Sequence, residues 1–153
     1  MSLIKELKLV PDQQEFIKYG GFSSSYNGWG STYAGCIKSL RQALEFEKSK
    51  GIIAAPSQQI LYNVVMGQFF KLLQVPYSLV PVKNTVRFAN ESEIRFISLQ
   101  NPGRILGIIC NWVWFDCKTD GNYFPKWELL KNCIRLPETT VGMNKAWITG
   151  IDL

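Results

Sequence analysis

The sequence predicts an α/β fold in which helices flank a mainly parallel sheet. Residues 52–55 form a short, wholly apolar run closed by Pro56, and the run IICNWVWFD is nearly as apolar up to Asp116. Parallel strands that are covered on both faces have this composition. A strand–helix–strand–helix order in the first half favours right-handed crossovers between parallel strands. The 153 residues, of which 46% are hydrophobic, suit one domain with a buried core, here residues 1–153.

The first half of the chain predicts two strands and two helices. Apolar residues recur every three or four positions in two stretches, as in amphipathic helices, and two shorter stretches suit buried strands. Serine and glycine are frequent between the first strand and the first helix, which indicates a loop. In order, the predicted elements are a strand at residues 14–19, a loop at 22–32, a helix at 33–50, a strand at 52–55 and a helix at 58–74 that Ser57 caps.

The second half predicts short strands, one helix and a last strand. Residues 85–89 and 93–99 are joined by Asn90-Glu91-Ser92, which indicates a hairpin. Asn101-Pro102 predicts a brief turn or helix before the strand that ends at Asp116. The remaining predicted elements are a strand at residues 77–82, a loop at 118–125, a helix at 126–134 and a strand at 145–150.

The charge of the chain is mildly basic. Seventeen basic and twelve acidic residues give a formal net charge of +5 and a pI near 9.1. This excess favours phosphate-rich partners such as nucleic acid, although an ordinary soluble protein with a slightly basic surface has the same composition. The start of the chain shows no secretory leader, and the longest strongly apolar stretch, residues 105–115, is about half of a bilayer crossing. We therefore expect a soluble protein of the cytoplasm.

The residue types present exclude several kinds of chemistry. The chain contains no histidine, which removes Ser-His and Cys-His hydrolase mechanisms. Its cysteines form no CxxC pair, so a zinc site is not expected. We expect all four to be small buried side chains: Cys36, Cys110, Cys117 and Cys133. Any reaction must use carboxylates, backbone amides, hydroxyls and a bound metal ion.

The loop before the first long helix is a candidate phosphate site. Nucleotide-binding sheets place a glycine-rich turn there, so that backbone amides and the helix dipole face a phosphate. Gly30, Ser31 and Thr32 stand directly before the helix, and the Thr32 hydroxyl could bind a magnesium ion. Ser31 occupies the position of the usual lysine, and the spacing of the upstream glycines differs from the standard motif. A serine-rich structural turn therefore remains the alternative.

Asp116 is the second candidate, because it ends the most apolar strand of the sequence. A carboxylate at the end of a central strand, beside a phosphate loop, can hold magnesium through water. The alternative is a solvated residue at a strand end.

Basic and aromatic residues are interleaved in the second half, a pattern that can bind single strands. Most of the tryptophans lie in apolar strands or helices, so core packing is the better interpretation for Trp112, Trp114, Trp127 and Trp147. Among the cations, Arg104 and Lys118 are the candidates for phosphate contact, with a solvated face as the alternative.

Three segments, in this order and spacing, resemble the ATPase domain of phage and viral large terminases, the motors that pump DNA into procapsids. They are PDQQEFIKYGG, GSTYAGCIKSLRQAL and VRFANESEIRFISLQNPGRILGIICNWVWFDC. The resemblance covers nearly the whole chain and implies a P-loop NTPase-like (RecA/ASCE-type) sheet with a β-hairpin insertion. The final stretch KAWITGIDL resembles the strand that couples hydrolysis to movement.

The resemblance also implies a site for ATP and Mg2+. Gln13 or Gln14 would approach the adenine, while Gly30, Ser31 and Thr32 would belong to the phosphate loop. Thr32 and Asp116 would hold the metal ion, and Asp116 would be the catalytic carboxylate.

Two departures from the family pattern predict impaired hydrolysis. Ser31 replaces the phosphate-loop lysine, and Cys117 replaces the glutamate that orients the attacking water. Each loss normally costs orders of magnitude in rate. Residues that could substitute are Lys18 or Lys38 for the cation and Asp120 or Glu128 for the carboxylate, although nothing in the sequence selects them.

Two functional hypotheses follow from the resemblance. The first is an ATPase subunit of a DNA-packaging motor in the host cytoplasm, with double-stranded DNA, other terminase subunits, the portal protein and further copies of itself as partners. The second is a non-catalytic terminase fragment or remnant that binds DNA or a partner protein. A helicase-like ATPase would need later arginine-rich motifs that this chain is too short to hold. The family's nuclease domain, with its clustered metal-binding acids, is absent from the sequence.

Overall fold

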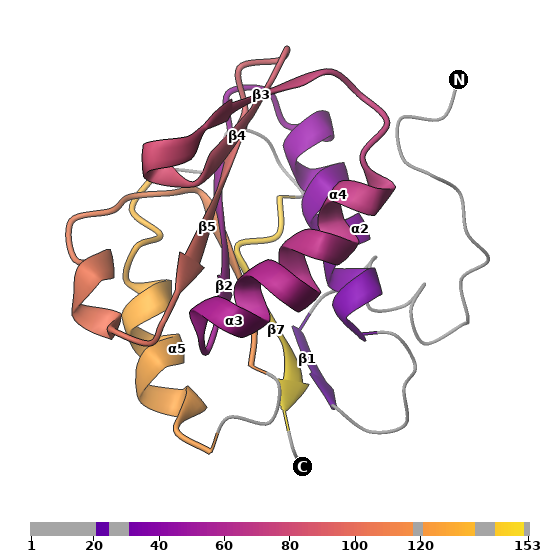
Figure 1. Ribbon diagram of the computed structural model, residues 1–153. Helices are drawn as coiled ribbons and strands as arrows, with labels where there is room; N and C mark the ends of the chain where they lie inside the picture. Colours follow the sequence, from indigo (N-terminus) through magenta and orange to yellow (C-terminus); the bar gives the residue numbers. More distant parts are fainter. Residues whose placement is uncertain (1–20, 25–30, 118–120, 137–142, 152–153) are drawn as a thin grey trace.

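A computed structural model describes residues 21–24, 31–117, 121–136 and 143–151 (Figure 1). Their strands form one seven-stranded sheet. The strands are β1 (Gly21–Ser24), β2 (Lys50–Ala55), β3 (Tyr77–Val80), β4 (Thr85–Phe88), β5 (Glu93–Ser98), β6 (Trp112–Asp116) and β7 (Ala146–Ile151). The helices are α2 (Ser31–Glu45), α3 (Gln58–Ile60), η2 (Leu61–Met66), α4 (Gly67–Leu72), η3 (Pro81–Lys83), η4 (Pro102–Ile105) and α5 (Tyr123–Lys131).

The order of the strands is β1-β7-β6-β2-β5-β4-β3. The pairs β1–β7, β7–β6, β6–β2 and β2–β5 are parallel, whereas β5–β4 and β4–β3 are antiparallel. The predicted α/β class, with a mainly parallel sheet, flanking helices and a hairpin, is therefore confirmed. Because β7 lies between β1 and β6, the last described segment of the chain is an interior strand, second from one edge of the sheet.

Helices cover both faces of the parallel strands (Figure 1). Helix α2 and the continuous α3–η2–α4 segment pack on one face, in a cluster that includes Leu40, Phe69 and Trp114. Helix α5 and η4 pack on the other, in a cluster that includes Phe115 and Trp127. All four tryptophans predicted for the core are buried, as are all four cysteines.

The hairpin turn closes the carboxyl end of helix α2. Asn90 Nδ2 donates to the Ala43 carbonyl at 2.8 Å, and Ser92 Oγ donates to the same oxygen at 2.8 Å. The last carbonyls of a helix have no partner within the helix, so these donors satisfy a group that would otherwise need water. The turn itself needs Glu91 at φ +66°. The Asn-Glu-Ser sequence thus joins β4 to β5 and fixes them to α2.

Glycine permits the close approach of two tryptophans to their neighbours. A Cβ on Gly35 of α2 would lie 2.1 Å from Trp114 Cζ2, and one on Gly51 of β2 would lie 2.0 Å from Trp112 Cζ2. Trp112 also stacks on Trp147, with centroids 5.1 Å apart and ring planes at 18°. The distance from α2 to β6 is therefore set by an indole ring lying directly on a helix backbone.

Several predicted boundaries were wrong. Residues 22–24 were predicted as the beginning of a loop, yet together with Gly21 they form β1, which pairs with β7. Helix α2 ends at Glu45 instead of residue 50, since Lys50 already belongs to β2. The last helix occupies residues 123–131 instead of 126–134. The predicted strand at residues 14–19 lies outside the described residues.

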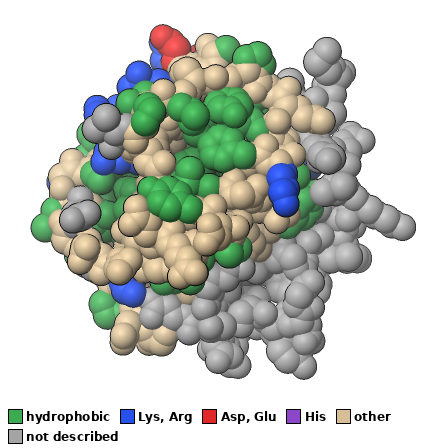
Figure 2. Space-filling view, viewed as in Figure 1, with side chains coloured by type: hydrophobic (Ala, Val, Ile, Leu, Met, Phe, Trp, Pro, Cys, Tyr) green, Lys and Arg blue, Asp and Glu red, His purple; other side chains and the backbone are tan. Residues whose placement is uncertain are grey.

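The molecule exposes several apolar side chains away from the two cores. Figure 2 shows apolar groups on the face that carries α3 and α4, with lysine and arginine side chains near η3 and β4. The exposed fractions of Tyr77 and Leu79, both on the edge strand β3, are 45% and 56%. No helix in the described part of the chain has the length and apolar character that a membrane crossing requires.

We expect Gly35→Ala and Gly51→Ala each to lower the free energy of unfolding by about 1–3 kcal/mol, because the added methyl group overlaps a buried indole. Urea unfolding followed by circular dichroism measures the change. Gly67→Ala is the matched control, since a Cβ there has its nearest neighbour at 3.9 Å and the backbone is helical. That substitution should leave stability unchanged or raise it by about 0.5–1 kcal/mol. Equal effects at the three positions would contradict the packing argument.

Candidate active site

Asp116 ends strand β6 with its carboxylate buried between three segments of the chain. Its exposed fraction is 0%. Thr32 Oγ1, from the first turn of α2, donates to Asp116 Oδ2 at 2.6 Å. Thr149 Oγ1, from β7, donates to Asp116 Oδ1 at 3.0 Å. Both oxygens of the carboxylate therefore accept hydroxyl hydrogen bonds from neighbouring elements.

A tryptophan extends this arrangement. Trp114 Nε1 donates to Thr149 Oγ1 at 2.9 Å, so the Thr149 hydroxyl accepts from the indole and donates to the carboxylate. The backbone also holds β6 and β7 together at this point. Asp116 and Thr149 are in register, and Cys117 N donates to the Thr149 carbonyl at 2.8 Å. The chain Trp114–Thr149–Asp116–Thr32 thus joins β6, β7 and α2.

The location of this network is typical of ligand sites in parallel α/β sheets. Asp116 and Thr149 lie near the carboxyl ends of adjacent parallel strands, and Thr32 lies at the amino end of a helix that packs on them. Ligands of such sheets bind outside the carboxyl ends of the strands. A helix amino end also favours anions, because its backbone N–H groups and its dipole point at them.

The side-chain oxygens of this network suit magnesium. Mg2+ prefers oxygen ligands and is usually held by one or two carboxylates together with water and substrate phosphates. One carboxylate and one hydroxyl, from Asp116 and Thr32, satisfy that requirement. Within the described ranges there is no group of three or more His, Cys, Asp or Glu side chains that would form a metal site made by the protein alone.

Cys117 does not face the Asp116 network. Alternate residues of β6 point to opposite faces of the sheet, so Trp112, Trp114 and Asp116 face α2 while Cys117 belongs to the apolar cluster under α5. Its side chain is fully buried in that cluster. Cys117, which the sequence resemblance assigned to the position of a glutamate, is therefore a buried side chain in an apolar cluster.

The two described substitutes considered from the sequence lie elsewhere. Lys38 is only 3% exposed, and its Nζ lies 5.1 Å from the centroid of the Trp147 ring, six residues along α2 from Thr32. Glu128 lies on the surface of α5 and pairs with Lys131 at 2.9 Å. Among the described residues, the side chains that donate to Asp116 include those of Thr32 and Thr149.

Other predicted site residues lie partly outside the described chain. Gln13, Gln14, Gly30 and Lys118 are not among the described residues, and neither are the proposed substitutes Lys18 and Asp120. Ser31 is the first residue of α2 and Arg104 lies in η4. The structure thus brings together Thr32 and Asp116, the two residues predicted for the metal ion.

Solved structures of phage large terminases superpose on most of this chain. The large terminase of the thermophilic bacteriophage D6E in complex with ADP gives a TM-score of 0.73 at 13% identity, over 94% of this chain and 39% of that one. The ATPase domain of the Thermus phage P74-26 large terminase gives 0.67 at 15% identity, over 95% and 64%. The chain has the fold of a large terminase ATPase domain.

This similarity confirms the predicted resemblance and the P-loop NTPase-like class at the level of the fold. A second D6E terminase structure agrees, with a TM-score of 0.70 at 14% identity over 94% of this chain and 38% of that one. The chain therefore spans less than half of the D6E terminases. No family model matches the sequence, and no curated protein matches it.

Two members of the network were missed from the sequence. Thr149 was part of a stretch compared with the coupling strand of terminases, yet it was not named as a site residue. Trp114 was assigned to core packing, which is correct for its ring but leaves out its N–H group. A hydroxyl residue inside an otherwise apolar strand was the available signal for Thr149.

We expect Thr149→Val to lower the free energy of unfolding by about 1–3 kcal/mol, because the buried Asp116 and Trp114 groups each lose a partner. Trp114→Phe removes only the donor and part of the ring. In a double-mutant cycle, the two changes should couple by about 0.5–3 kcal/mol. Pairing Thr149→Val with Trp112→Phe is the control, since the Trp112 N–H has no hydrogen-bond partner among the described residues. Equal coupling in both cycles would show that the hydrogen bond contributes nothing.

The buried Lys38 predicts a stability change at alkaline pH. Burial lowers the pKa of Lys38 from 10.5 to about 8. Between these pH values the unfolded chain binds one more proton than the folded chain, so this residue makes stability rise with pH across that window. Burial raises the pKa of Cys110 to about 12, which has the opposite effect. Cys110 is present in both wild type and Lys38→Met, so its contribution cancels when the two are compared. The unfolding free energy of wild type minus that of Lys38→Met should increase from pH 8 to 10.5.

Denaturant unfolding at several pH values gives that difference. A difference that stays constant across the window would show that Lys38 has its ordinary pKa in the folded chain, and a difference that falls would show that its pKa is raised.

Proposed function

We propose that this chain binds ATP with Mg2+ at Thr32 and Asp116 and acts as the ATPase part of a DNA-packaging motor, with little hydrolysis of its own. The observation that carries the proposal is the 2.6 Å hydrogen bond between the first turn of α2 and the end of β6. It places a hydroxyl and a carboxylate together at the carboxyl edge of a sheet with the terminase fold. A D6E terminase of the same fold has been solved in complex with ADP.

In this proposal Asp116 and Thr32 hold the metal ion beside the phosphates. Thr32 would turn its hydroxyl from the carboxylate to the metal, while Thr149 continues to donate to Asp116 Oδ1. The bound Mg2+ would neutralise part of the triphosphate charge. Gly30 and Ser31 would contribute backbone amides to the phosphates, and Gln13 or Gln14 would approach the adenine.

Weak hydrolysis follows from two positions. Ser31 carries no charge for the triphosphate. Cys117 is buried in the apolar cluster under α5, so it supplies no base for water. The buried position of Lys38 and the surface pairing of Glu128 also favour binding without efficient turnover.

Weak hydrolysis would also favour the second functional hypothesis, a terminase fragment that binds DNA or a partner without catalysis. Both versions share the same proposed partners, namely double-stranded DNA, other terminase subunits, the portal protein and further copies of this chain. Arg104 and Lys118 remain proposed contacts to DNA. The two versions differ in turnover, which one set of samples can measure.

The test is Mg2+-dependent binding of a fluorescent ATP analogue, with hydrolysis followed in the same samples. We expect Thr32→Ala and Asp116→Asn each to weaken binding about tenfold or more, since each removes a charged or charge-assisted contact. Thr32→Ser keeps the hydroxyl and should bind like the wild type. Ser39→Ala is the control, because it removes a buried hydroxyl from the same helix, where Ser39 bonds only its own helix through the Gly35 carbonyl at 2.8 Å.

The outcomes distinguish a nucleotide-binding chain without turnover, an active ATPase and a chain that binds no nucleotide. Binding that depends on Thr32 and Asp116 with negligible hydrolysis would support the proposal and the non-catalytic version. Rapid turnover would require a cation and a base that come from outside the described network. Absence of binding at millimolar nucleotide would end the ATPase proposal and leave the fold alone.

A further inference from the structure

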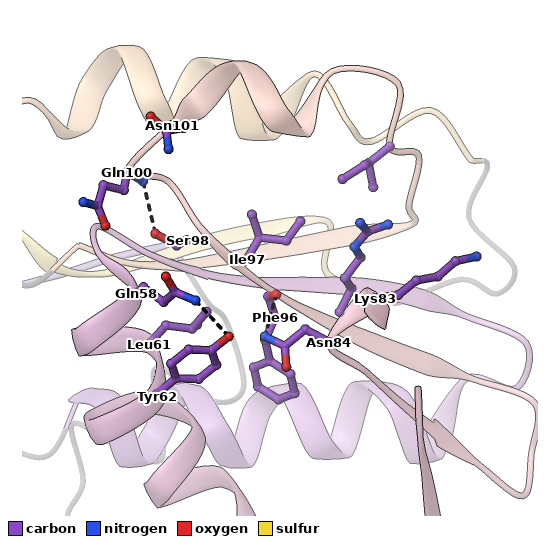
Figure 3. A pocket seen from close by; sticks show the side chains of 12 residues that line it. Gln58, Leu61, Tyr62, Lys83, Asn84, Phe96, Ile97, Ser98, Gln100 and Asn101 are labelled. Atoms are coloured by element: carbon purple, nitrogen blue, oxygen red, sulfur yellow. Dashed lines mark hydrogen bonds between the residues drawn. The ribbon is translucent and has the colours of Figure 1, made fainter. Parts of the chain in front are cut away.

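Two adjoining cavities lie on the sheet away from the Asp116 network. The first, of about 230 Å³, lies between η2, η3 and the end of β5, and its lining includes Gln58, Asn84 and Asn101 (Figure 3). The second, of about 240 Å³, lies over β2, β4 and β5. Lys83, Arg95 and Ile108 line both cavities, so the two hollows meet at a pair of cations.

The described lining of these cavities is strongly basic. Its cations are Lys50, Lys83, Arg87 and Arg95, and its one carboxylate is that of Glu93. Glu93 pairs with Arg87 at 3.0 Å and lies 4.0 Å from Lys50. Among the described residues, Lys83 and Arg95 have no acidic partner. The excess positive charge is therefore concentrated where the two cavities meet.

The sheet fixes the direction of these side chains. Arg95 lies opposite Thr85 of β4 and Ile52 of β2, and Glu93 lies opposite Arg87 and Lys50. Alternate residues of β5 share a face, so Arg95 and Glu93 lie on one face of the sheet while Ile94 is buried on the other. Arg95 is thus held by a central part of the sheet instead of a loop.

Uncharged donors continue the basic site into the first cavity. Asn84 has φ +49°, and its Nδ2 donates to the Phe96 carbonyl at 3.2 Å, which fixes the residue after Lys83 against β5. Figure 3 shows Gln58 and Tyr62 on one side of this cavity and Lys83 and Asn84 on another, with Gln100 and Asn101 beyond Ser98. Side chains of these types bind phosphate oxygens and sugars in nucleic-acid complexes.

We propose that the surface formed by Lys83 and Arg95 binds the phosphodiester backbone of a nucleic acid. The two cavities extend on either side of these cations, which leaves room for a chain of phosphates instead of a single phosphate. The inference deepens the proposed function by assigning its DNA contact to residues other than Arg104 and Lys118. It rests only on the DNA part of that proposal, because no residue of the Asp116 network is involved.

The test compares Lys83→Gln/Arg95→Gln with Arg41→Gln/Lys71→Gln, a pair that removes the same charges from exposed positions on α2 and α4. Binding of a labelled DNA duplex of mixed sequence is measured by fluorescence anisotropy over a range of salt concentrations. Loss of two phosphate contacts should weaken binding roughly tenfold and lower the salt slope by about 2, at close to 0.9 per contact. The control pair should change neither quantity by a comparable amount. Lys83→Arg/Arg95→Lys keeps both charges and should retain most of the affinity, which guards against a folding defect.

Two further measurements separate the possible outcomes. Tripolyphosphate is added as a competitor. If Lys83→Gln/Arg95→Gln loses tripolyphosphate binding but keeps duplex binding, the proposal is overturned in favour of a free phosphate ligand. If its duplex binding and its tripolyphosphate binding are both unchanged, the proposal is overturned outright. Mg2+-dependent binding of the ATP analogue should be unaffected by all three pairs, so failure of the ATP site and failure of this surface are seen independently. A wild-type chain that binds no duplex would overturn both this inference and the DNA part of the proposed function.

Discussion

The close packing of helix α2 on strand β6 determines where the described site residues meet. Gly35 admits the Trp114 ring against the helix backbone, and Thr32 lies one turn earlier on the same helix. A larger residue at position 35 would move α2 away from β6, and with it the hydroxyl that reaches Asp116 at 2.6 Å. A packing contact in the core therefore controls a polar contact at the edge of the sheet.

Burial makes the polar network at Asp116 energetically demanding. A buried carboxylate is costly unless its oxygens accept hydrogen bonds, and the loss of one partner leaves the remaining groups unsatisfied. Hydroxyls from α2 and β7 both reach this carboxylate, and the indole of Trp114 orients one of them. Any ligand that draws Thr32 away must replace its hydrogen bond. The network consequently connects the occupancy of the site with the position of α2 relative to β6 and β7.

The fold class and much of the order of the elements could be predicted from the sequence. A large core requires apolar strands and helices with one apolar face, and both leave recognisable patterns in the sequence. Strand β1 was missed because Gly21–Ser24 has the composition of a loop, and its strand conformation depends on pairing with β7, some 125 residues later. The same limit applies to Thr149, whose role depends on its register with Asp116. Thr32 and Asp116 could be predicted because their positions relative to a helix start and a strand end are local features. That the Cys117 side chain points to the face covered by α5 could not be predicted, because it depends on which helix covers which face of the sheet.

The intrinsic tryptophan fluorescence of this protein reports on its fold. Those that the structure describes are buried, so their emission should be blue-shifted, and Trp114 alone among them donates to the hydroxyl that holds Asp116. Indole emission responds to the strength and polarity of a hydrogen bond at its N–H group. A change at the carboxylate would therefore alter the spectrum of one identified residue, and the protein carries an intrinsic optical probe beside Asp116.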